Sequence, residues 1–221
     1  MKTLFILQAR VNSKRLFAKS ILPIYKNRSS IEIIIDKVKK CKFIDKVYIA
    51  TGPFKKNKKI FSILKNKTNI FFGDENNVRK RFEIIQKKEN ADLVIRATGD
   101  NPLIDIDLLR YLLNYIKKNN QISYLKVNHD YVSPGFSVEI FKSEYFFKHL
   151  NSDQSSYGKE HVTCHMLKKN KSKILKPPKI FHTPPIRITL DTIDDFKFLK
   201  YLYSKIKNPN LKKFNKFFKF K

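Results

Sequence analysis

Glycine, cysteine and tryptophan are scarce in this 221-residue chain, which contains five glycines, two cysteines and no tryptophan. With so few glycines, the chain has neither the G-x-x-x-x-G-K-[ST] pattern of a P-loop nor the G-x-G-x-x-G pattern of a dinucleotide site. Cys41 and Cys164 lack metal-ligand spacing, and two cysteines argue against a disulfide scaffold. Any anion that this protein binds must therefore be held mainly by side chains.

Long apolar runs are also missing. No run approaches the roughly 20 residues that a membrane-spanning helix needs. The first ten residues are briefly apolar, but they lack the small-residue cleavage site of a secretory signal. Hydrophobic residues nevertheless make up 42% of the chain, which is enough for a globular core. We therefore expect a globular protein of the cytoplasm.

Acidic residues are few, with 19 Asp and Glu against 47 Lys and Arg and a net charge of +28. Such an excess of cations is typical of nucleic-acid-binding proteins. However, only eight of these cations are arginines, and the lysines are scattered along the whole chain. Base readout and bidentate phosphate contacts favour arginine, because its planar fork matches those acceptors. We therefore expect no dedicated nucleic-acid binding.

Short apolar runs alternate with amphipathic segments along the first 120 residues. The pattern predicts strands at 3–8, 46–51, 68–73 and 92–100. It predicts helices at 29–41, 77–90 and 105–119. This alternation is typical of an α/β fold with a parallel sheet.

The second half of the chain is less regular. The pattern predicts strands at 124–128, 138–141 and 186–192. It predicts helices at 143–150, 157–170 and 193–206, with a proline-rich connecting loop at 173–185. We expect one domain over residues 1–207, followed by a Lys- and Phe-rich tail at 208–221.

The stretch LQARVNSKRLFAKSI, residues 7–21, presents cationic and hydroxyl side chains directly after the first predicted strand. A second loop, TGDNP at 98–102, follows the fourth strand and carries Asp100. Loops that follow parallel strands meet at one edge of the sheet, where α/β proteins bind their ligands. Cations suit phosphates and a carboxylate suits Mg²⁺, so the two loops together predict a site for a metal-bridged nucleoside triphosphate.

The segment QARVNSKRLFAK resembles the opening signature of the sugar cytidylyltransferases. The resemblance continues to about residue 204 through FGDENNVRKRF, DLVIRATGDNPLID, GFSVEIF, KEHVT and IRITLDTIDDF, in the order of the family. The cytidylyltransferase-like proteins of spore-coat polysaccharide biosynthesis are the most similar branch, and the acylneuraminate and 3-deoxy-octulosonate cytidylyltransferases are wider relatives. The resemblance implies a Rossmann-like nucleotide-diphospho-sugar transferase fold, with a mostly parallel central sheet flanked by helices.

This resemblance also implies an activity, which is the Mg²⁺-dependent transfer of CMP from CTP to a sugar or sugar acid, with release of pyrophosphate, for surface polysaccharide. By resemblance, the triphosphate would be held by Arg10, Ser13, Arg15 and Lys19, and the metal by Asp100 and Asp191. Arg10, Lys19 and Asp100 would be catalytic. The residues expected on the substrate side are Ser137, Glu139, Glu160 and His161. A homodimer is also implied.

Several positions leave alternatives open. Phe17 and Ala18 stand where the family usually has Pro and Gly, which leaves room for a catalytically reduced nucleotide-binding or scaffold protein of the same fold. Asp191 could simply cap the last helix, and Glu160 with His161 could be structural. The tail could contact an anionic surface weakly or be a frayed terminus. Its apolar residues at helical spacing are Leu211, Phe214, Phe217 and Phe218.

Overall fold

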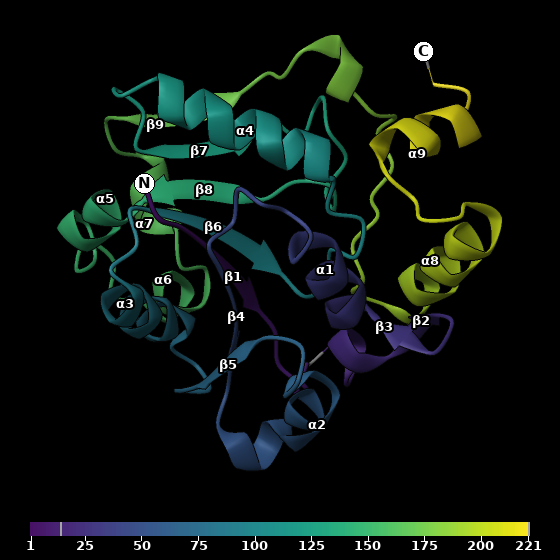
Figure 1. Cartoon of the computed structure of the whole chain (residues 1–221), viewed down its shortest axis with the longest axis horizontal. Coiled ribbons are helices and arrows are strands. Elements are labelled where there is room, and N and C mark those ends of the chain that lie inside the picture. The colour runs from purple at the N-terminus through teal and green to yellow at the C-terminus, as the bar shows by residue number, and fades with distance from the viewer. Residues whose placement is uncertain (14, 221) are drawn as a thin grey trace.

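A mostly parallel sheet of seven strands forms the centre of the molecule, in a computed structural model that describes residues 1–13 and 15–220 (Figure 1). The strand order is β5-β4-β1-β6-β8-β7-β9. Strand β8 runs antiparallel to its neighbours β6 and β7, and the other pairs in this sheet are parallel. The strands are β1 Thr3–Gln8, β4 Lys46–Thr51, β5 Asn69–Phe72, β6 Leu93–Thr98, β7 Tyr124–Val127, β8 Glu139–Lys142 and β9 Ser172–Leu175. The predicted α/β fold is therefore confirmed.

Helices cover both faces of this sheet. They are α1 Ser30–Val38, α2 Phe54–Leu64, α3 Val78–Glu89, α4 Ile106–Lys118, α5 Ser143–Lys148, α6 Ser156–Glu160, α7 Cys164–Leu167, α8 Ile193–Lys205 and α9 Leu211–Phe217. Side chains alternate along each strand, so Phe5 and Ile95 join one apolar cluster with α1 and α4. Leu4 and Val94 face the opposite cluster, with α3 and α5. No described helix is long and apolar enough to span a bilayer.

Local signals begin several of the predicted helices. Ser29 and Glu32 form a reciprocal capping box at the start of α1. The Asp105 carboxylate accepts a hydrogen bond from the backbone N–H of Leu108 at 2.9 Å and caps α4. The cap of α3 is Asn77. These helices confirm the predictions to within a few residues at each end.

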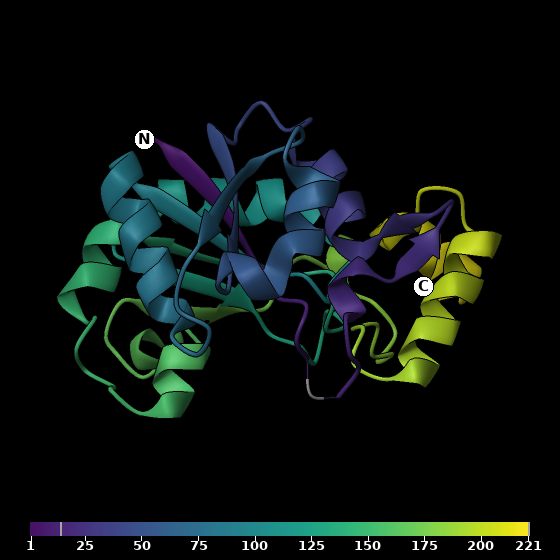
Figure 2. The ribbon, with the colours of Figure 1, turned by 90° about the horizontal axis from the view of Figure 1, so that it is seen from below.

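A short hairpin that the pattern did not predict follows the first loop. It consists of β2 Pro23–Tyr25 and β3 Arg28–Ser29, and two one-turn 3-10 helices, η1 Lys19–Ile21 and η2 Lys179–Phe181, complete the elements. The hairpin and α8 lie side by side at one end of the molecule (Figure 2). The rings of Tyr25 and Tyr203 pack there with their centroids 5.6 Å apart. The first and last thirds of the chain are thus joined beside the first loop.

Three predictions for the second half are wrong. The helix predicted at 157–170 is divided into α6 and α7, because Val162 between them has a φ of 50°. The segment 173–185 is not only a loop, since β9 pairs with β7 at its start. The segment 186–192 is not a strand of the sheet; Ile188 N–H donates to the Pro134 carbonyl and Leu190 N–H to the Asp100 carbonyl. Helix α2 was not predicted.

The C-terminal segment from residue 208 packs onto the core. Phe214 is fully buried, and its ring lies edge-on to Phe136 with centroids 5.0 Å apart. The backbone N–H of Leu211 donates to Asp105 Oδ2 at 2.9 Å. Of the two alternatives for the tail, the frayed terminus is wrong, because the segment forms α9 and buries Leu211 and Phe214 in the core. The same burial makes these two residues unavailable to an anionic surface.

Candidate functional site

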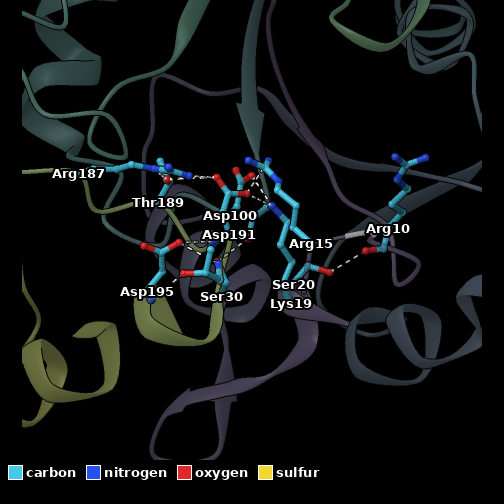
Figure 3. Close-up of polar contacts among 12 residues, drawn as sticks. Arg10, Arg15, Lys19, Ser20, Ser30, Asp100, Arg187, Thr189, Asp191 and Asp195 are labelled. Atoms are coloured by element: carbon cyan, nitrogen blue, oxygen red, sulfur yellow. Dashed lines mark hydrogen bonds and ion pairs between the residues drawn. The ribbon is translucent and has the colours of Figure 1, made fainter. Parts of the chain in front are cut away.

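Two carboxylates and a lysine meet at the carboxyl end of the sheet (Figure 3). The Nζ atom of Lys19 lies 2.7 Å from Asp100 Oδ2 and 2.7 Å from Asp191 Oδ1. Lys19 comes from η1, Asp100 from the loop after β6, and Asp191 from the segment before α8. The structure therefore brings together three of the residues predicted for the site, from three distant parts of the chain.

Two arginines add positive charge to Asp191. Arg15 Nη2 lies 2.7 Å from Asp191 Oδ1, and Arg187 forms an ion pair with the other carboxylate oxygen. Burial alone would raise the pKa of Asp191, but the hydrogen bond and charge of Lys19, with the charges of Arg15 and Arg187, outweigh it and lower that pKa. The Asp191 side chain is therefore held ionised, although it is only 7% exposed. We call the set Arg15, Lys19, Asp100, Arg187 and Asp191 the Lys19 cluster.

Hydrogen bonds to backbone carbonyls hold the loop that carries Asp100 against its neighbours. The N–H of Leu190 donates to the Asp100 carbonyl at 2.8 Å, and the Ser30 hydroxyl donates to the Gly99 carbonyl at 2.5 Å. Asp191 does not cap α8, so the alternative in which capping is its sole role is wrong. The cap is Thr192, whose side chain accepts a hydrogen bond from the backbone of Asp195.

The turn before Lys19 has an unusual backbone. Ala18 adopts the left-handed conformation, with φ 58° and ψ 17°, at the start of η1. This region favours glycine, since a Cβ atom there crowds the backbone. Ala18 therefore adds backbone strain directly before Lys19.

A cavity of about 400 Å³ extends from the Lys19 cluster across the ends of β1 and β6. This volume lies within the range of small-molecule sites. Seven residues predicted for the site line it, namely Arg10, Ser13, Arg15, Lys19, Asp100, Glu160 and His161. Two further lining residues, Arg81 and Arg96, were expected from their family motifs only in the surroundings of the site. The remaining lining residues were not assigned a role from the sequence, and they are Gln8, Ala9, Ser20, Val78, Thr98 and Gly99.

Arg10 points away from the Lys19 cluster (Figure 3). Its Nη2 atom lies 3.1 Å from Glu160 Oε1, and its Nη1 atom lies 3.9 Å from Glu75 Oε1. The Ser20 hydroxyl donates to the Arg10 carbonyl at 3.1 Å and fixes the backbone there. The structure thus separates Arg10 from Arg15 and Lys19, and its role on the triphosphate stays a prediction.

The substrate-side residues lie in two different environments. Glu139 is paired with Arg96 Nη1 at 2.7 Å and accepts the Thr163 hydroxyl at 2.5 Å. Burial would raise the pKa of Glu139, but the Arg96 charge and the Thr163 hydrogen bond lower it overall. His161 lies against Tyr157, with ring centroids 4.1 Å apart, and it lines the cavity.

Ser137 is half-buried just before β8 and does not line the cavity. Glu139 is likewise absent from the cavity wall, although its partner Arg96 belongs to that wall. Sequence reasoning placed both residues on the substrate side from their motif alone. The pairing of Arg96 with Glu139 was not foreseen, because it depends on the antiparallel register of β6 and β8.

The carboxylates are the groups that could hold a metal ion. Within residues 1–13 and 15–220, no cluster of three or more His, Cys, Asp or Glu side chains has the arrangement of a metal site. Asp100 and Asp191 form a pair whose oxygens both contact one ammonium group. Two carboxylates match the way Mg²⁺ is commonly held, with substrate phosphates and water as its other ligands. The donor set therefore fits a magnesium ion that arrives with a triphosphate.

Comparisons with known proteins show the family of this chain. The profile of the cytidylyltransferase family matches residues 4–216. The uncharacterized protein MJ1063 of Methanocaldococcus jannaschii is 35% identical over 206 residues, which cover 89% of this chain and 81% of that protein. The spore coat polysaccharide biosynthesis protein SpsF of Bacillus subtilis is 27% identical over 214 residues, which cover 91% of this chain and 86% of that protein.

A solved structure of a cytidylyltransferase is also similar to this chain. A cytidylyltransferase from Leptospira borgpetersenii superposes with a TM-score of 0.85 at 27% sequence identity. The match covers 93% of this chain and 88% of the other. The two proteins therefore share the same fold over nearly the whole of this chain.

Proposed function

Because this chain belongs to the cytidylyltransferase family, we propose that it transfers CMP from CTP to a hydroxyl group of a sugar or sugar acid and releases pyrophosphate. The observation that carries the proposal is the Lys19 cluster, in which one lysine joins Asp100 and Asp191 beside a cavity of about 400 Å³. The cationic side chains that could bind the phosphates lie there in contact with the two carboxylates that could bind a metal ion.

The reaction makes a bond between the acceptor oxygen and the α-phosphorus of CTP. The bond from that phosphorus to the β-phosphate oxygen breaks, and the acceptor hydroxyl loses its proton. Lys19 and Arg15 are suited to bind phosphate oxygens, since charge-assisted hydrogen bonds are the strongest that side chains offer. These donors stabilise the negative charge that develops during transfer. Arg10 and Ser13, on the wall of the same cavity, are proposed as further triphosphate contacts.

Asp100 and Asp191 would hold Mg²⁺, which supplies positive charge at the phosphates when it is bound. The lowered pKa of Asp191 supports this role, because only the ionised carboxylate is a metal ligand. Lys19 neutralises both carboxylates in the arrangement described above. Binding of CTP with Mg²⁺ would let Lys19 exchange these carboxylates for phosphate oxygens.

The acceptor and its destination are proposed from the relatives. SpsF, by its name, takes part in spore coat polysaccharide biosynthesis, which supports a role in surface polysaccharide. We expect the reaction in the cytoplasm, where CTP is made. A homodimer is a separate prediction, which size-exclusion chromatography with light scattering would test.

The test is pyrophosphate release from CTP and Mg²⁺ with a panel of sugars and sugar acids. We expect Asp100→Ala to lower turnover by about 100- to 1,000-fold, the order of effect seen when a charge-stabilising group is lost. Asp194→Ala is the matched control, because that carboxylate is exposed on α8 and, among the residues that the structure describes, pairs only with Lys197 at 3.5 Å. An Asp100→Ala protein with wild-type turnover would contradict the metal assignment.

A nucleotide-binding protein with reduced catalysis is the second candidate, and the left-handed Ala18 favours it. That backbone strain lies directly before Lys19. Tight binding of CTP without pyrophosphate release for any acceptor would support this alternative. A melting temperature measured with each nucleoside triphosphate shows the binding, since a ligand at 100 times its Kd stabilises by about 2.7 kcal/mol.

A further inference from the structure

A second cavity lies beside the segment that follows Asp100. Its volume is about 1170 Å³, and within the described part of the chain it shares no lining residue with the cavity beside the Lys19 cluster. Its walls come from α1, from the start of α4, from α8 and from the hairpin of β2 and β3, which Figure 2 shows next to α8. We call it the Lys37 cavity, and the proposed reaction makes no use of it.

Positive charge dominates the wall of the Lys37 cavity. Six cationic side chains line it, while Asp36 is its single carboxylate among the described residues. Four of the cations are lysines, and the other two are Arg28 and Arg110. Arg28 forms an ion pair with Asp36, whereas Arg110 approaches Asp107 only to 3.9 Å. The wall therefore keeps a net positive charge, which suits an anionic ligand.

Lys37 is the most deeply placed of these cations. Its Nζ atom donates to the carbonyl oxygens of Pro102 at 3.1 Å, Ile104 at 3.4 Å and Pro209 at 3.4 Å, and it has no ion pair within residues 1–13 and 15–220. Burial lowers the pKa of Lys37 to about 8, although the charge of Asp105 opposes this. A cation removed from water is unfavourable without a counter-charge. An anion bound in the cavity would supply that charge.

Aromatic rings form another part of the wall. The rings of Tyr25 and Tyr203 pack with their centroids 5.6 Å apart, and both residues line the cavity. The guanidinium carbon of Arg110 lies 5.4 Å from the centroid of the Phe43 ring. Aromatic faces attract a flat ring beyond the effect of burial alone. The cavity therefore suits a molecule that joins a flat ring to an anionic group.

The Lys37 cavity is connected to the Lys19 cluster through one backbone carbonyl. The carbonyl of Pro102, two residues after Asp100, accepts hydrogen bonds from Lys37 and from the Tyr203 hydroxyl at 3.0 Å. Both donors belong to the cavity wall. A ligand that draws the Lys37 ammonium away from this carbonyl would loosen the loop that positions Asp100.

We propose that the Lys37 cavity is an effector site for a phosphate ester that carries a flat ring. The phosphate binds Lys37 and Arg110, since ammonium and guanidinium groups both form charge-assisted hydrogen bonds with phosphate oxygens. The ring lies against Tyr25 and Phe43. The occupant competes with the Pro102 carbonyl for Lys37, and thereby changes the placement of Asp100. Binding at this site does not depend on the reaction proposed above.

Isothermal titration with phenyl phosphate, without nucleotide or Mg²⁺, tests the binding. We expect Lys37→Met to weaken it about 10- to 100-fold, as for the loss of a hydrogen bond to a charged group. Arg110→Met, at an exposed position of the wall, gives the same test if Lys37→Met does not fold. Arg15→Met is the matched control, because Arg15 lines the other cavity. This control should keep the wild-type affinity for phenyl phosphate.

Two smaller probes separate the phosphate from the ring. Inorganic phosphate should bind about 3- to 10-fold more weakly than phenyl phosphate, because it lacks the ring. Benzyl alcohol, which lacks the charge, should show no binding. Equal affinities for the two phosphates would mean a general attraction to cations and would overturn the assignment. It is also overturned if the wild type does not bind phenyl phosphate, if Lys37→Met or its substitute Arg110→Met binds as the wild type does, or if Arg15→Met loses the binding.

The backbone amide resonance of Leu103, between Pro102 and Ile104, reports the link to Asp100. In the Arg15→Met protein, we expect phenyl phosphate to shift this resonance and benzyl alcohol to leave it unchanged. A Leu103 resonance that stays in place at saturating phenyl phosphate contradicts the effector role.

Discussion

Two groups of charged and polar side chains, one at the carboxyl end of the sheet and one between α3 and α7, differ in how they are partnered. In the Lys19 cluster, every charge contacts an opposite charge. In the layer formed by α3 and α7, three basic side chains are buried with unpaired nitrogens in the described part of the chain. These are Arg79, Arg81 and His165.

The difference teaches how burial acts on each group. Opposite charges around Asp191 keep its carboxyl ionised, even though burial opposes this. Around His165, burial and the Arg79 charge act together and lower the pKa of the imidazole to about 4. Removing one charged side chain from the Lys19 cluster should therefore destabilise the protein. In the α3–α7 layer, protonation of His165 should destabilise it.

The largest expected loss of stability follows from breaking the Lys19 cluster. Lys19→Met leaves Asp100 and Asp191 close together without the ammonium group between them. We expect the free energy of unfolding to fall by about 3–4 kcal/mol, as for a buried pair that loses one partner. Urea denaturation at pH 7 measures the change, with Lys197→Met on the surface of α8 as the control. A loss no larger than that of the control would show that Lys19 contributes little to the fold.

As the pH falls, the protein should lose stability first through His165 in the α3–α7 layer and only later through Asp191 in the Lys19 cluster. The folded-state pKa of His165 is lowered from 6.5 to about 4, so the unfolded chain binds the proton more readily. Stability is therefore lost as the pH falls from about 6.5 towards 4, by about 2–3 kcal/mol in total. The pKa of Asp191 is lowered from 3.8, so its contribution is lost only at a lower pH.

Urea denaturation between pH 7 and pH 4 measures this loss. His165→Leu removes the titrating group and keeps an apolar side chain beside Phe146, whose ring lies 5.6 Å from the imidazole. We expect this variant to lose less stability than the wild type over that interval. Equal losses in the two proteins would contradict the role of His165.

The smallest expected effect concerns the turn that presents Lys19. Ala18→Gly removes the Cβ atom at a φ of 58° and should relieve about 1 kcal/mol of strain. The greater freedom of glycine in the unfolded chain offsets part of this gain. We therefore expect a net stabilisation of about 0.5 kcal/mol in thermal unfolding. The control is Ala9→Gly, because Ala9 lies on the cavity wall and does not have a positive φ. This change should lower the stability of the protein. If Ala18→Gly lowers the stability of the protein, the backbone at Ala18 is not strained.

Local chemistry made much of the fold predictable. The capping residues Ser29 and Asp105, and the apolar runs at 3–8 and 46–51, act within a few residues of themselves. The strand predicted at 186–192 was wrong for a physical reason. Ile188 and Leu190 are buried and Arg187 is exposed, so the alternation is real, but it comes from packing against Pro134 and Asp100 rather than from a sheet.

The site was predictable only in part. Arg15, Lys19, Asp100 and Asp191 were found because they follow strands or match a family motif, and the structure brings them together. Arg81 was assigned only to the surroundings of the site, from its family motif, and its burial on the cavity wall was not predicted. Such a property depends on contacts between distant segments.

Helix α9 has a consequence for truncation of the chain. Phe214 is fully buried and fills the core beside Phe136, with the two ring centroids 5.0 Å apart. A chain cut before α9 would keep the strands of the sheet but would leave the ring of Phe136 uncovered. Such a fragment would expose aromatic surface to aggregation and proteolysis.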